Sequence, residues 1–206
     1  LDALNSKFQN LDKTIDSHEI VRNQDKVFAR KLVSQTITIR KKLIFNSKKS
    51  GTNLIRVDGV LPCPFLHKLS PSLSIPEHLG LRSVLCHNLG ITPWQNHVDE
   101  PLALDRFDNG PFFLQLFVRG NPFSGHYAIQ EPWLSAIRQL QSHNLLMGLV
   151  VYGSPYFWKE VNSVLNSSIP SAYSPGQMEE AQKQLLSCFF ESKKVTQIST
   201  HQEKAI

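Results

Sequence analysis

The sequence predicts an α/β protein: a three-layer α/β/α sandwich whose mostly parallel sheet has about five strands. The most informative stretch is Leu146–Tyr156, where an apolar run is followed by a Gly-Ser-Pro turn and the start of a helix. Six of its first seven residues are apolar, with Gly148 the exception, so little alternation remains for a water-facing side. This pattern is typical of a central strand in a parallel sheet that helices cover on both faces.

A second observation supports this fold class, because strand-like and helix-like stretches alternate along most of the chain. Such alternation implies right-handed crossover connections between parallel strands. We expect residues 1–50 to be a helical linker, residues 51–191 to form the sandwich, and residues 192–206 to be a polar tail.

The N-terminal segment is expected to contain a long helix. Asp16 is its expected start, because Glu19 three positions later fits a capping box with Asp in place of Ser or Thr. Apolar residues then recur at helical spacing, which predicts a stripe that faces a core. These residues are Ile20, Val21, Val27, Phe28 and Leu32. The β-branched alternation of Thr36–Arg40 predicts extended chain, and the basic residues 41–51 predict a loop.

The first half of the sandwich is expected to contain three strands. They are Asn53–Leu61, Leu81–Cys86 and Phe112–Val118. Residues 62–80 carry four prolines, which predicts only short helical turns. Residues 87–110 are polar and predict a long loop, a kind of segment that is often functional inside a compact domain.

The second half is expected to alternate helices and strands. A helix is expected near Pro132, and a fourth strand over Leu145–Tyr152. Ser154 is expected to cap the next helix, with Pro155 at its first position. A short fifth strand is expected over Ser168–Tyr173. Ser174-Pro175-Gly176-Gln177 then predicts a last helix, whose apolar stripe is Met178, Ala181, Leu185, Cys188 and Phe189.

The net charge of +5 is unevenly distributed. Residues 1–50 hold 11 Lys+Arg and 5 Asp+Glu, a net of +6, and the remainder has a net of −1. Basic density can indicate nucleic-acid binding, but no aromatic platform or nucleic-acid motif accompanies it. We interpret it as a solvated helix face, or a face docked on an acidic neighbour, and expect no nucleic-acid partner. No run reaches the roughly 18 apolar residues of a membrane span.

The start of the chain and its cysteines bear on compartment and metals. Leu1 begins the chain without a signal-peptide pattern, which predicts a piece of a longer chain or a processed one. Three sparse cysteines argue against a disulfide framework. They are Cys63, Cys86 and Cys188. His67 follows Cys63 by four positions and His87 follows Cys86, but zinc needs about four convergent ligands. We expect no metal and no cofactor, and the compartment stays open with the cytoplasm as default.

Five pieces of the chain, in order and with their spacing, carry a resemblance to a known family. They are Phe28-Ala29-Arg30-Lys31-Leu32-Val33, Val57-Asp58, Leu116-Phe117-Val118-Arg119-Gly120-Asn121-Pro122-Phe123, Val151-Tyr152-Gly153-Ser154-Pro155-Tyr156 and Tyr173-Ser174-Pro175-Gly176-Gln177-Met178. Together they resemble the second domain of family 3 glycoside hydrolases, in particular the bacterial β-N-acetylglucosaminidase-like branch. The resemblance spans most of residues 20–190 and implies an α/β sandwich domain.

The resemblance also implies that a catalytic barrel carrying an aspartate nucleophile precedes this domain. Such a barrel needs about 250 residues, so it is expected to be absent from this chain. In the N-acetylglucosaminidase branch an Asp–His pair acts as acid/base in a barrel loop with a Lys-His-x-Pro-Gly motif, which this chain lacks. Asp16-Ser17-His18 imitates the branch's Asp-Ser-His triplet, but it lies at a helix start without a Gly-rich loop. We interpret it as an N-cap and exposed helix residues.

In glucosidase-like branches of the family, the acid/base glutamate can come from the second domain. The loop glutamates that could take this role are Glu77, Glu100 and Glu131. Glycosidase chemistry needs two carboxyl groups roughly 5–10 Å apart, and one partner is missing here. No catalytic residue is therefore assigned, and the simpler interpretation of each glutamate is a solvated carboxylate or a helix-start charge.

A serine hydrolase is the rival enzyme hypothesis, because Ser154 lies on a strand-to-helix turn like the nucleophile elbow. That motif requires Gly-x-Ser-x-Gly, however, and here the chain reads Gly153-Ser154-Pro155-Tyr156. Pro155 also removes an amide that the oxyanion hole of that fold uses. Ser154 is better explained as an N-cap.

A stand-alone carbohydrate- or anion-binding module is the second rival. Ligands of open α/β sheets bind at the carboxyl ends of strands, where the candidate substrate-binding residues are expected. These are Arg119, Asn121, Gly153 and Ser154, with Trp94 from the long polar loop as a stacking residue. Arg119 could equally form a salt bridge that orders its loop. Trp133 and Trp158 lie on helical apolar stripes and are expected in the core.

The sequence thus predicts the C-terminal domain of a glycosidase that hydrolyses β-linked N-acetylglucosamine or a related sugar of an oligosaccharide or cell wall. The domain is expected to be inactive alone and to dock on the catalytic barrel of the same parent protein. Because its docking face would be exposed, the isolated domain is expected to aggregate or to dimerise.

Overall fold

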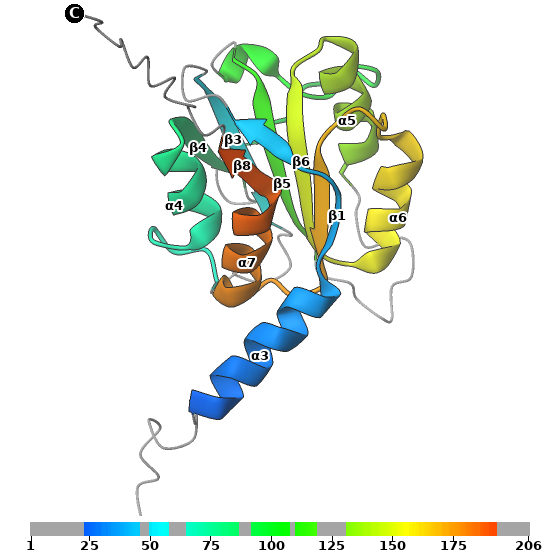
Figure 1. The fold of residues 1–206 in the computed structure, drawn as a ribbon. Coiled ribbons are helices and arrows are strands. Elements are labelled where there is room, and N and C mark those ends of the chain that lie inside the picture. The colour runs from blue at the N-terminus through cyan, green and yellow to red at the C-terminus, as the bar shows by residue number, and fades with distance from the viewer. Residues whose placement is uncertain are drawn as a thin grey trace, which may run out of the picture.

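The computed structural model describes residues 23–45, 50–57, 65–86, 92–107, 110–118 and 131–192. Within them lies a six-stranded sheet of order β1-β7-β6-β5-β3-β4, parallel except for β1 at one edge (Figure 1). The strands are β1 (Thr38–Lys41), β3 (Gly51–Val57), β4 (Leu81–Cys86), β5 (Phe112–Val118), β6 (Leu146–Gly153) and β7 (Ser171–Ser174).

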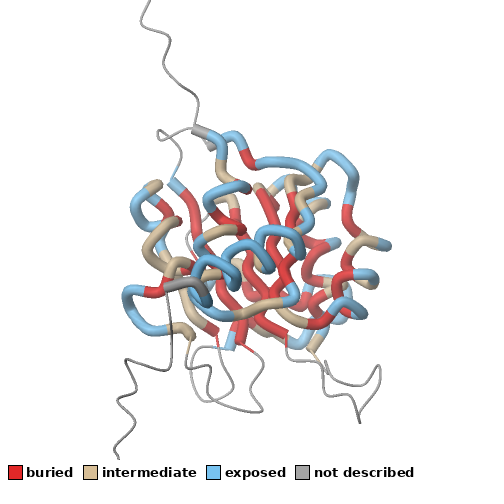
Figure 2. Tube along the Cα trace, turned by 60° about the horizontal axis from the view of Figure 1, so that its bottom comes forward, coloured by how far each residue is buried: buried red, intermediate tan, exposed pale blue. Residues whose placement is uncertain are grey.

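Helices cover both faces of the sheet, which confirms the predicted α/β/α sandwich. One face packs α5 (Trp133–Ser142) and α6 (Pro155–Val164), and the other packs α4 (Pro71–His78) and α7 (Glu179–Phe189). Two apolar clusters fill the two interfaces, and the buried residues run through the middle of the domain (Figure 2). β5 is buried at all seven positions, as expected for a central strand of a parallel sheet.

The strand order contains a switch point between β3 and β5. From β3 the chain crosses to β4 on one side and then returns to β5 on the other side, from which β6 and β7 follow outward. In open α/β sheets, ligands bind outside the carboxyl ends of the strands at such a point. The carboxyl edge is therefore where a functional site is expected.

Several sequence predictions are confirmed. β4 and β5 have the predicted bounds, and β6 is shifted by one residue. Ser154 is the N-cap of α6, where its hydroxyl accepts a hydrogen bond from the Phe157 N–H. Trp133 and Trp158 are buried, as their helical spacing predicted.

The N-terminal stripe does not face a core. Helix α3 (Asn23–Thr36) forms, but Val27, Phe28 and Leu32 are 65%, 62% and 47% exposed. The stripe prediction is wrong for these three, because α3 projects from the sandwich and its main packing within the described residues is against α7 (Figure 1). Asp16, Ile20 and Val21 lie outside the described residues.

The expected loop 41–51 contains a strand instead. β2 (Leu43–Phe45) pairs in parallel with β8 (Phe190–Ser192) in a separate two-stranded sheet. Leu43 is buried there because Gly148 leaves room for it: a Cβ at Gly148 would lie 3.2 Å from Leu43 Cδ2 and 3.3 Å from Phe189 Cζ. The described part of residues 1–50 therefore contributes two strands, β1 and β2, to the fold.

The proline-rich stretch 62–80 also differs from its prediction. α4 is a regular helix with Pro71 at its start and Pro76 inside it. Pro76 has no N–H to donate to the carbonyl of Ser72 one turn earlier. That carbonyl instead accepts hydrogen bonds from Asn53 Nδ2 (2.9 Å) and Gln115 Nε2 (2.7 Å) in the sheet. The proline thus frees a carbonyl that ties the helix to β3 and β5.

The last helix begins later than predicted. α7 starts at Glu179 with Met178 as its N-cap, whereas Ser174-Pro175 had been expected to open it. Gln177 does not serve a capping box, because its Nε2 donates to the Tyr152 carbonyl at 3.2 Å. Cys188 and Met178 are exposed, which contradicts their predicted place on the buried stripe.

Candidate functional site at the carboxyl edge

An ion pair lies at the carboxyl end of β3, beside the switch point. Arg56 is the penultimate residue of β3 and is 6% exposed. Its Nη2 donates to Glu131 Oε1 at 2.7 Å, and its Nε donates to the other carboxylate oxygen. Trp133 Nε1 also donates to Glu131 Oε2, at 2.9 Å. We call Arg56, Glu131 and Trp133 the Arg56 group.

The Arg56 group has a structural explanation. A buried guanidinium is costly unless a charge of opposite sign pairs with it, and Glu131 supplies that charge just before α5. Both carboxylate oxygens of Glu131 accept hydrogen bonds, so this glutamate is arranged as an acceptor and not as a proton donor. Of the three loop glutamates that the sequence offered as acid/base candidates, only Glu131 lies in this group.

Cys86 ends β4 opposite Arg56. Burial raises the pKa of the Cys86 thiol to about 11, although the nearby Arg56 charge acts to lower it. The thiol is therefore neutral near pH 7, and thiolate is the form that binds metals or acts as a nucleophile. Cys63 and His87, which the sequence analysis weighed and set aside as zinc ligands, lie outside the described residues. Within the described ranges, no group of three or more His, Cys, Asp or Glu could hold a metal ion.

A sharp turn follows β6 on the same edge. Gly153 has a φ of 107°, and a Cβ there would lie 2.0 Å from the Val118 carbonyl oxygen. Only glycine fits this backbone. The Tyr173 hydroxyl donates a hydrogen bond to the Gly153 carbonyl at 3.0 Å. The turn is therefore held by this hydrogen bond as well as by its close approach to Val118.

Ser154 follows this turn and is 7% exposed. Its Oγ accepts the Phe157 N–H at 3.3 Å, and its own N–H donates to the Val118 carbonyl at 3.0 Å. Among the hydrogen bonds of the described residues, none joins Ser154 to a histidine. The arrangement fits an N-cap and not an activated nucleophile.

Trp94 lies in the polar loop that follows β4 and is half-buried. Its ring meets Trp133 edge to face, with 4.6 Å between ring centroids. Gln139 of α5 fixes this loop, because its side-chain amide accepts from the Leu102 N–H (2.9 Å) and donates to the Leu102 carbonyl (3.1 Å). The Trp94 ring therefore packs against the core in an ordered loop, and only part of the residue is accessible to solvent.

Of the remaining sequence candidates, the two glutamates that the structure describes do not lie with these groups. Glu77 is exposed on α4, and Glu100 is exposed with an oxygen 3.4 Å from His143 Nε2. Arg119, Asn121 and the Asp16-Ser17-His18 triplet lie outside the described residues. Gly153 and Ser154 share the carboxyl edge with Arg56, on the other side of β5.

A buried polar network on the opposite face of the sheet was missed from the sequence. Gln115 Nε2 donates to Asn53 Oδ1 at 2.7 Å, and the Tyr152 hydroxyl donates to Gln115 Oε1 at 3.2 Å. The Ser72 N–H donates to Gln182 Oε1 at 3.1 Å, which joins α4 to α7. Burial raises the pKa of Tyr152 well above its ordinary value, so it remains a neutral donor. The signal was an amide side chain inside each of two apolar strands.

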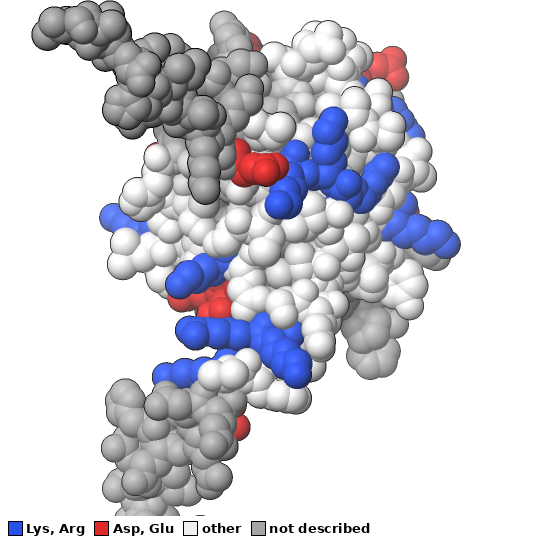
Figure 3. Space-filling model, viewed as in Figure 1, with Lys and Arg blue, Asp and Glu red and all other residues white. Residues whose placement is uncertain are grey.

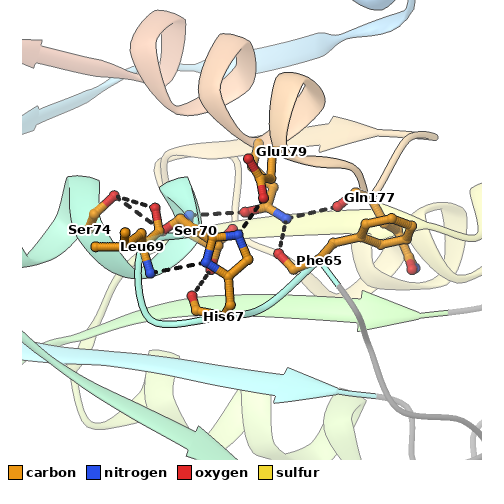
Figure 4. Close-up of polar contacts among 9 residues, drawn as sticks. Phe65, His67, Leu69, Ser70, Ser74, Gln177 and Glu179 are labelled. Carbon is orange, nitrogen blue, oxygen red and sulfur yellow. Dashed lines mark hydrogen bonds and ion pairs between the residues drawn. The ribbon is translucent and has the colours of Figure 1, made fainter. Parts of the chain in front are cut away.

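The first turn of α7 carries a second side-chain contact to a glutamate, between His67 and Glu179, shown in Figure 4. His67 Nε2 meets Glu179 Oε1, and His67 Nδ1 accepts the Leu69 N–H at 3.3 Å. Gln182 Nε2 donates to the carbonyls of Phe65 (3.0 Å) and Gln177 (2.8 Å).

Two serines lie beside His67 without forming a catalytic triad. Ser70 Oγ donates to the backbone carbonyl of His67 at 2.6 Å, and Ser74 Oγ donates to the Ser70 carbonyl at 3.1 Å. Neither hydroxyl hydrogen-bonds to the imidazole, as a nucleophile would need. We interpret the arrangement as a fold contact that holds the 65–70 turn on α7.

Comparison with protein families places these observations in context. The model of the bacterial glycosyl hydrolase family 3 C-terminal domain matches residues 44–191. No curated protein matches the chain significantly. Among the described residues, none of the helices has the length and apolar character that a membrane span requires.

Two glycosidases are among the solved structures that this chain resembles. A glycoside hydrolase family 3 β-N-acetylglucosaminidase from Paenibacillus sp. str. FPU-7 has a TM-score of 0.50 and 10% identity, over 82% of this chain and 31% of that one. The β-N-acetylglucosaminidase from Thermotoga maritima has a TM-score of 0.43 and 13% identity, over 82% of this chain and 32% of that one. The chain thus spans about a third of the length of the solved proteins that it matches.

Proposed function

Because this chain belongs to the bacterial glycosyl hydrolase family 3 C-terminal domain family, we propose that it is the non-catalytic domain of a glycosidase. The parent enzyme hydrolyses β-linked N-acetylglucosamine or a related sugar from an oligosaccharide or cell-wall substrate. Bond cleavage takes place in a catalytic barrel domain of the same protein, and this domain docks on that barrel. The family match over residues 44–191 is the observation that carries the proposal.

The carboxyl edge supports a non-catalytic role. Glu131 accepts hydrogen bonds from Arg56 and Trp133, and the Ser154 hydroxyl caps α6. Glycoside hydrolysis uses two carboxyl groups across the scissile bond, one of which must donate a proton. Glu131 pairs with a buried arginine and accepts hydrogen bonds through both carboxylate oxygens. A structural role for Glu131 therefore explains these contacts better than a catalytic one.

The small share of the similar enzyme that this chain covers supports the presence of a companion domain in the parent protein. This chain spans 31% of the Paenibacillus protein that it matches. A (β/α)₈ barrel needs about 250 residues, more than the whole of this chain can supply. The substrate class rests on the motif resemblance, with the name of the similar Paenibacillus enzyme as further support.

An activity assay tests the proposal. The purified chain and the complete natural protein that contains it would each be given 4-nitrophenyl N-acetyl-β-glucosaminide and 4-nitrophenyl β-glucoside. We expect no release of nitrophenol by the chain alone, and release from the N-acetylglucosaminide by the complete protein. Hydrolysis by the chain alone would show that it is catalytic, and preference for the glucoside would overturn the substrate class.

A binding module is the second candidate function, because Trp94 keeps part of its ring accessible near the carboxyl edge. Its sugar contacts would come from Arg119, Asn121, Gly153, Ser154 and Trp94. Titration with N-acetylglucosamine or muropeptides, followed by tryptophan fluorescence, distinguishes this candidate. A saturable shift that Trp94→Ala abolishes would favour it, and no shift at millimolar ligand would remove it.

A further inference from the structure

A strap formed by β1 and β2 ties the N-terminal segment to the sandwich. We call residues 38–45 the strap: β1 pairs with β7 at the edge of the large sheet, Lys42 follows, and β2 pairs with β8. Only Ile37 separates α3 from β1, so the chain from α3 to the end of β2 contains no long loop. From the sheet edge the strap crosses the face that α7 covers and ends beside β8 (Figure 1).

The first half of the strap is fixed by polar contacts and is solvated outside. Arg40, Lys41 and Lys42 are exposed, and Figure 3 shows Lys and Arg side chains on this face of the domain. Arg40 Nη1 donates to Asn162 Oδ1 at 2.6 Å, and Lys41 Nζ donates to the Ser168 carbonyl at 2.8 Å. Charged side chains on an edge strand discourage pairing with a further strand. This half of the strap is therefore tied to α6 and to the turn after it.

The second half of the strap is anchored by one apolar side chain. Leu43 is 6% exposed and lies over Gly148 of β6, where a Cβ would be 3.2 Å from Leu43 Cδ2. The same Cβ would be 3.3 Å from Phe189 Cζ and 3.6 Å from Phe113 Cδ2. Phe190 of β8 also meets the Phe113 ring, with 5.1 Å between ring centroids. One apolar cluster therefore anchors both β2 and β8.

Among the described residues, β2 and β8 have only each other as strand partners. Their small sheet runs from the pair of Leu43 with Phe190 to the pair of Phe45 with Ser192, and it is separate from the large sheet. A two-stranded sheet is marginal in water by itself. Each of these two strands therefore depends on the other, and both depend on the apolar cluster beneath them.

We propose that β2 and β8 form a clasp, which locks the strap onto the sandwich and opens at both strands together. All of the chain before residue 38 is joined to the sandwich through the strap, so a closed clasp gives it a fixed attachment. Opening the clasp frees residues 43–45 and 190–192 as one cooperative unit and leaves the strap held by β1 alone. The proposal does not depend on the proposed function, because every residue of the clasp belongs to this chain.

Amide hydrogen exchange in the purified chain tests the clasp. Leu43→Thr keeps a strand-forming residue but removes the apolar anchor over Gly148. Ile44→Thr is the matched control, because it places the same residue at the next position, where the side chain is 56% exposed. We expect Leu43→Thr to speed exchange at least about tenfold in both 43–45 and 190–192, and by less in β5, which reports global unfolding. Ile44→Thr should leave all three segments within about twofold of wild type.

Three results of the Leu43→Thr experiment would overturn the clasp. Faster exchange in 43–45 with unchanged exchange in 190–192 would show that the two strands open separately. An equal rise in both strands and in β5 would show that the strap opens only when the whole sandwich unfolds. Unchanged exchange in 43–45 would show that Leu43 does not anchor the strap.

Gly148→Ala supplies the test if Leu43→Thr does not fold. Its methyl group would lie 3.2 Å from Leu43 Cδ2 and 3.3 Å from Phe189 Cζ, which forces the anchors of β2 and β8 to shift. We expect exchange in 43–45 and 190–192 to rise together, at least about threefold, and to rise less in β5. A rise in only one of the two strands, or in neither, would overturn the clasp.

Discussion

Two side-chain contacts to a glutamate hold loops onto the carboxyl edge of this sandwich, and they differ in burial. Arg56 and Glu131 have side chains that are 7% and 26% exposed, whereas those of His67 and Glu179 are 51% and 54% exposed. A buried charge that loses its partner stays in a low-dielectric interior, but an exposed charge is solvated again by water. Both contacts join a side-chain nitrogen to a carboxylate, yet the free energy of unfolding lost on substitution should differ severalfold between them.

The largest effect is expected at Glu131. Glu131→Ala leaves Arg56 buried without its carboxylate and should lower the free energy of unfolding by about 3–4 kcal/mol. Urea denaturation followed by tryptophan fluorescence measures this change. Glu77→Ala, at an exposed glutamate on α4, is the control and should stay within about 0.5 kcal/mol of wild type. A loss below about 1 kcal/mol at Glu131 would show that this ion pair is no stronger than a surface pair.

The second effect tests the turn after β6. Gly153→Ala should lower the free energy of unfolding by about 3 kcal/mol, for two reasons. Alanine rarely adopts this backbone conformation, and its Cβ would lie 2.0 Å from the Val118 carbonyl oxygen. Gly80 has a similar φ of 91°, but a Cβ there would meet nothing within 4 Å. Gly80→Ala should therefore cost only about 1 kcal/mol. Equal losses at the two sites would mean that the clash at Gly153 relaxes freely.

These residues also show where reasoning from sequence succeeds. The bounds of β4 and β5, the Ser154 cap and the buried Trp133 follow from local patterns: apolar runs, turn residues and helical spacing. Those patterns depend only on neighbours along the chain, so one sequence is enough to read them.

The failures share a different cause. The stripe of Val27, Phe28 and Leu32 has the spacing of a buried face, yet spacing cannot say whether the covering surface belongs to the same chain. The α4 helix was missed because Pro76 is a helix breaker unless distant residues use the carbonyl that it frees, as Asn53 and Gln115 do. The pairing of Arg56 with Glu131 joins residues 75 positions apart, which no local pattern reports.

A third effect concerns the capping serine. Ser154→Ala removes the acceptor for the Phe157 N–H and should cost about 1 kcal/mol. The control is Ser163→Ala, at an exposed serine of the same helix whose Oγ donates to the Glu160 carbonyl. It should change stability by less than about 0.5 kcal/mol. If the Ser154→Ala variant kept its fold but lost a measurable esterase activity, capping alone would not explain Ser154. The serine-hydrolase hypothesis would then be supported.

The smallest effect is expected at the exposed pair. Glu179→Gln keeps the shape of the side chain and removes its charge, so it should cost about 0.5 kcal/mol or less, because water competes for a contact whose two side chains are each about half exposed. The measurement is again urea denaturation. Glu180→Gln is the control, because it removes one charge from the same turn of α7 at the residue next to Glu179. It loses the contact with Arg30 instead. A loss at Glu179 as large as that at Glu131 would mean that the 65–70 turn excludes water from this pair. The first turn of α7 would then belong to the rigid part of the sandwich.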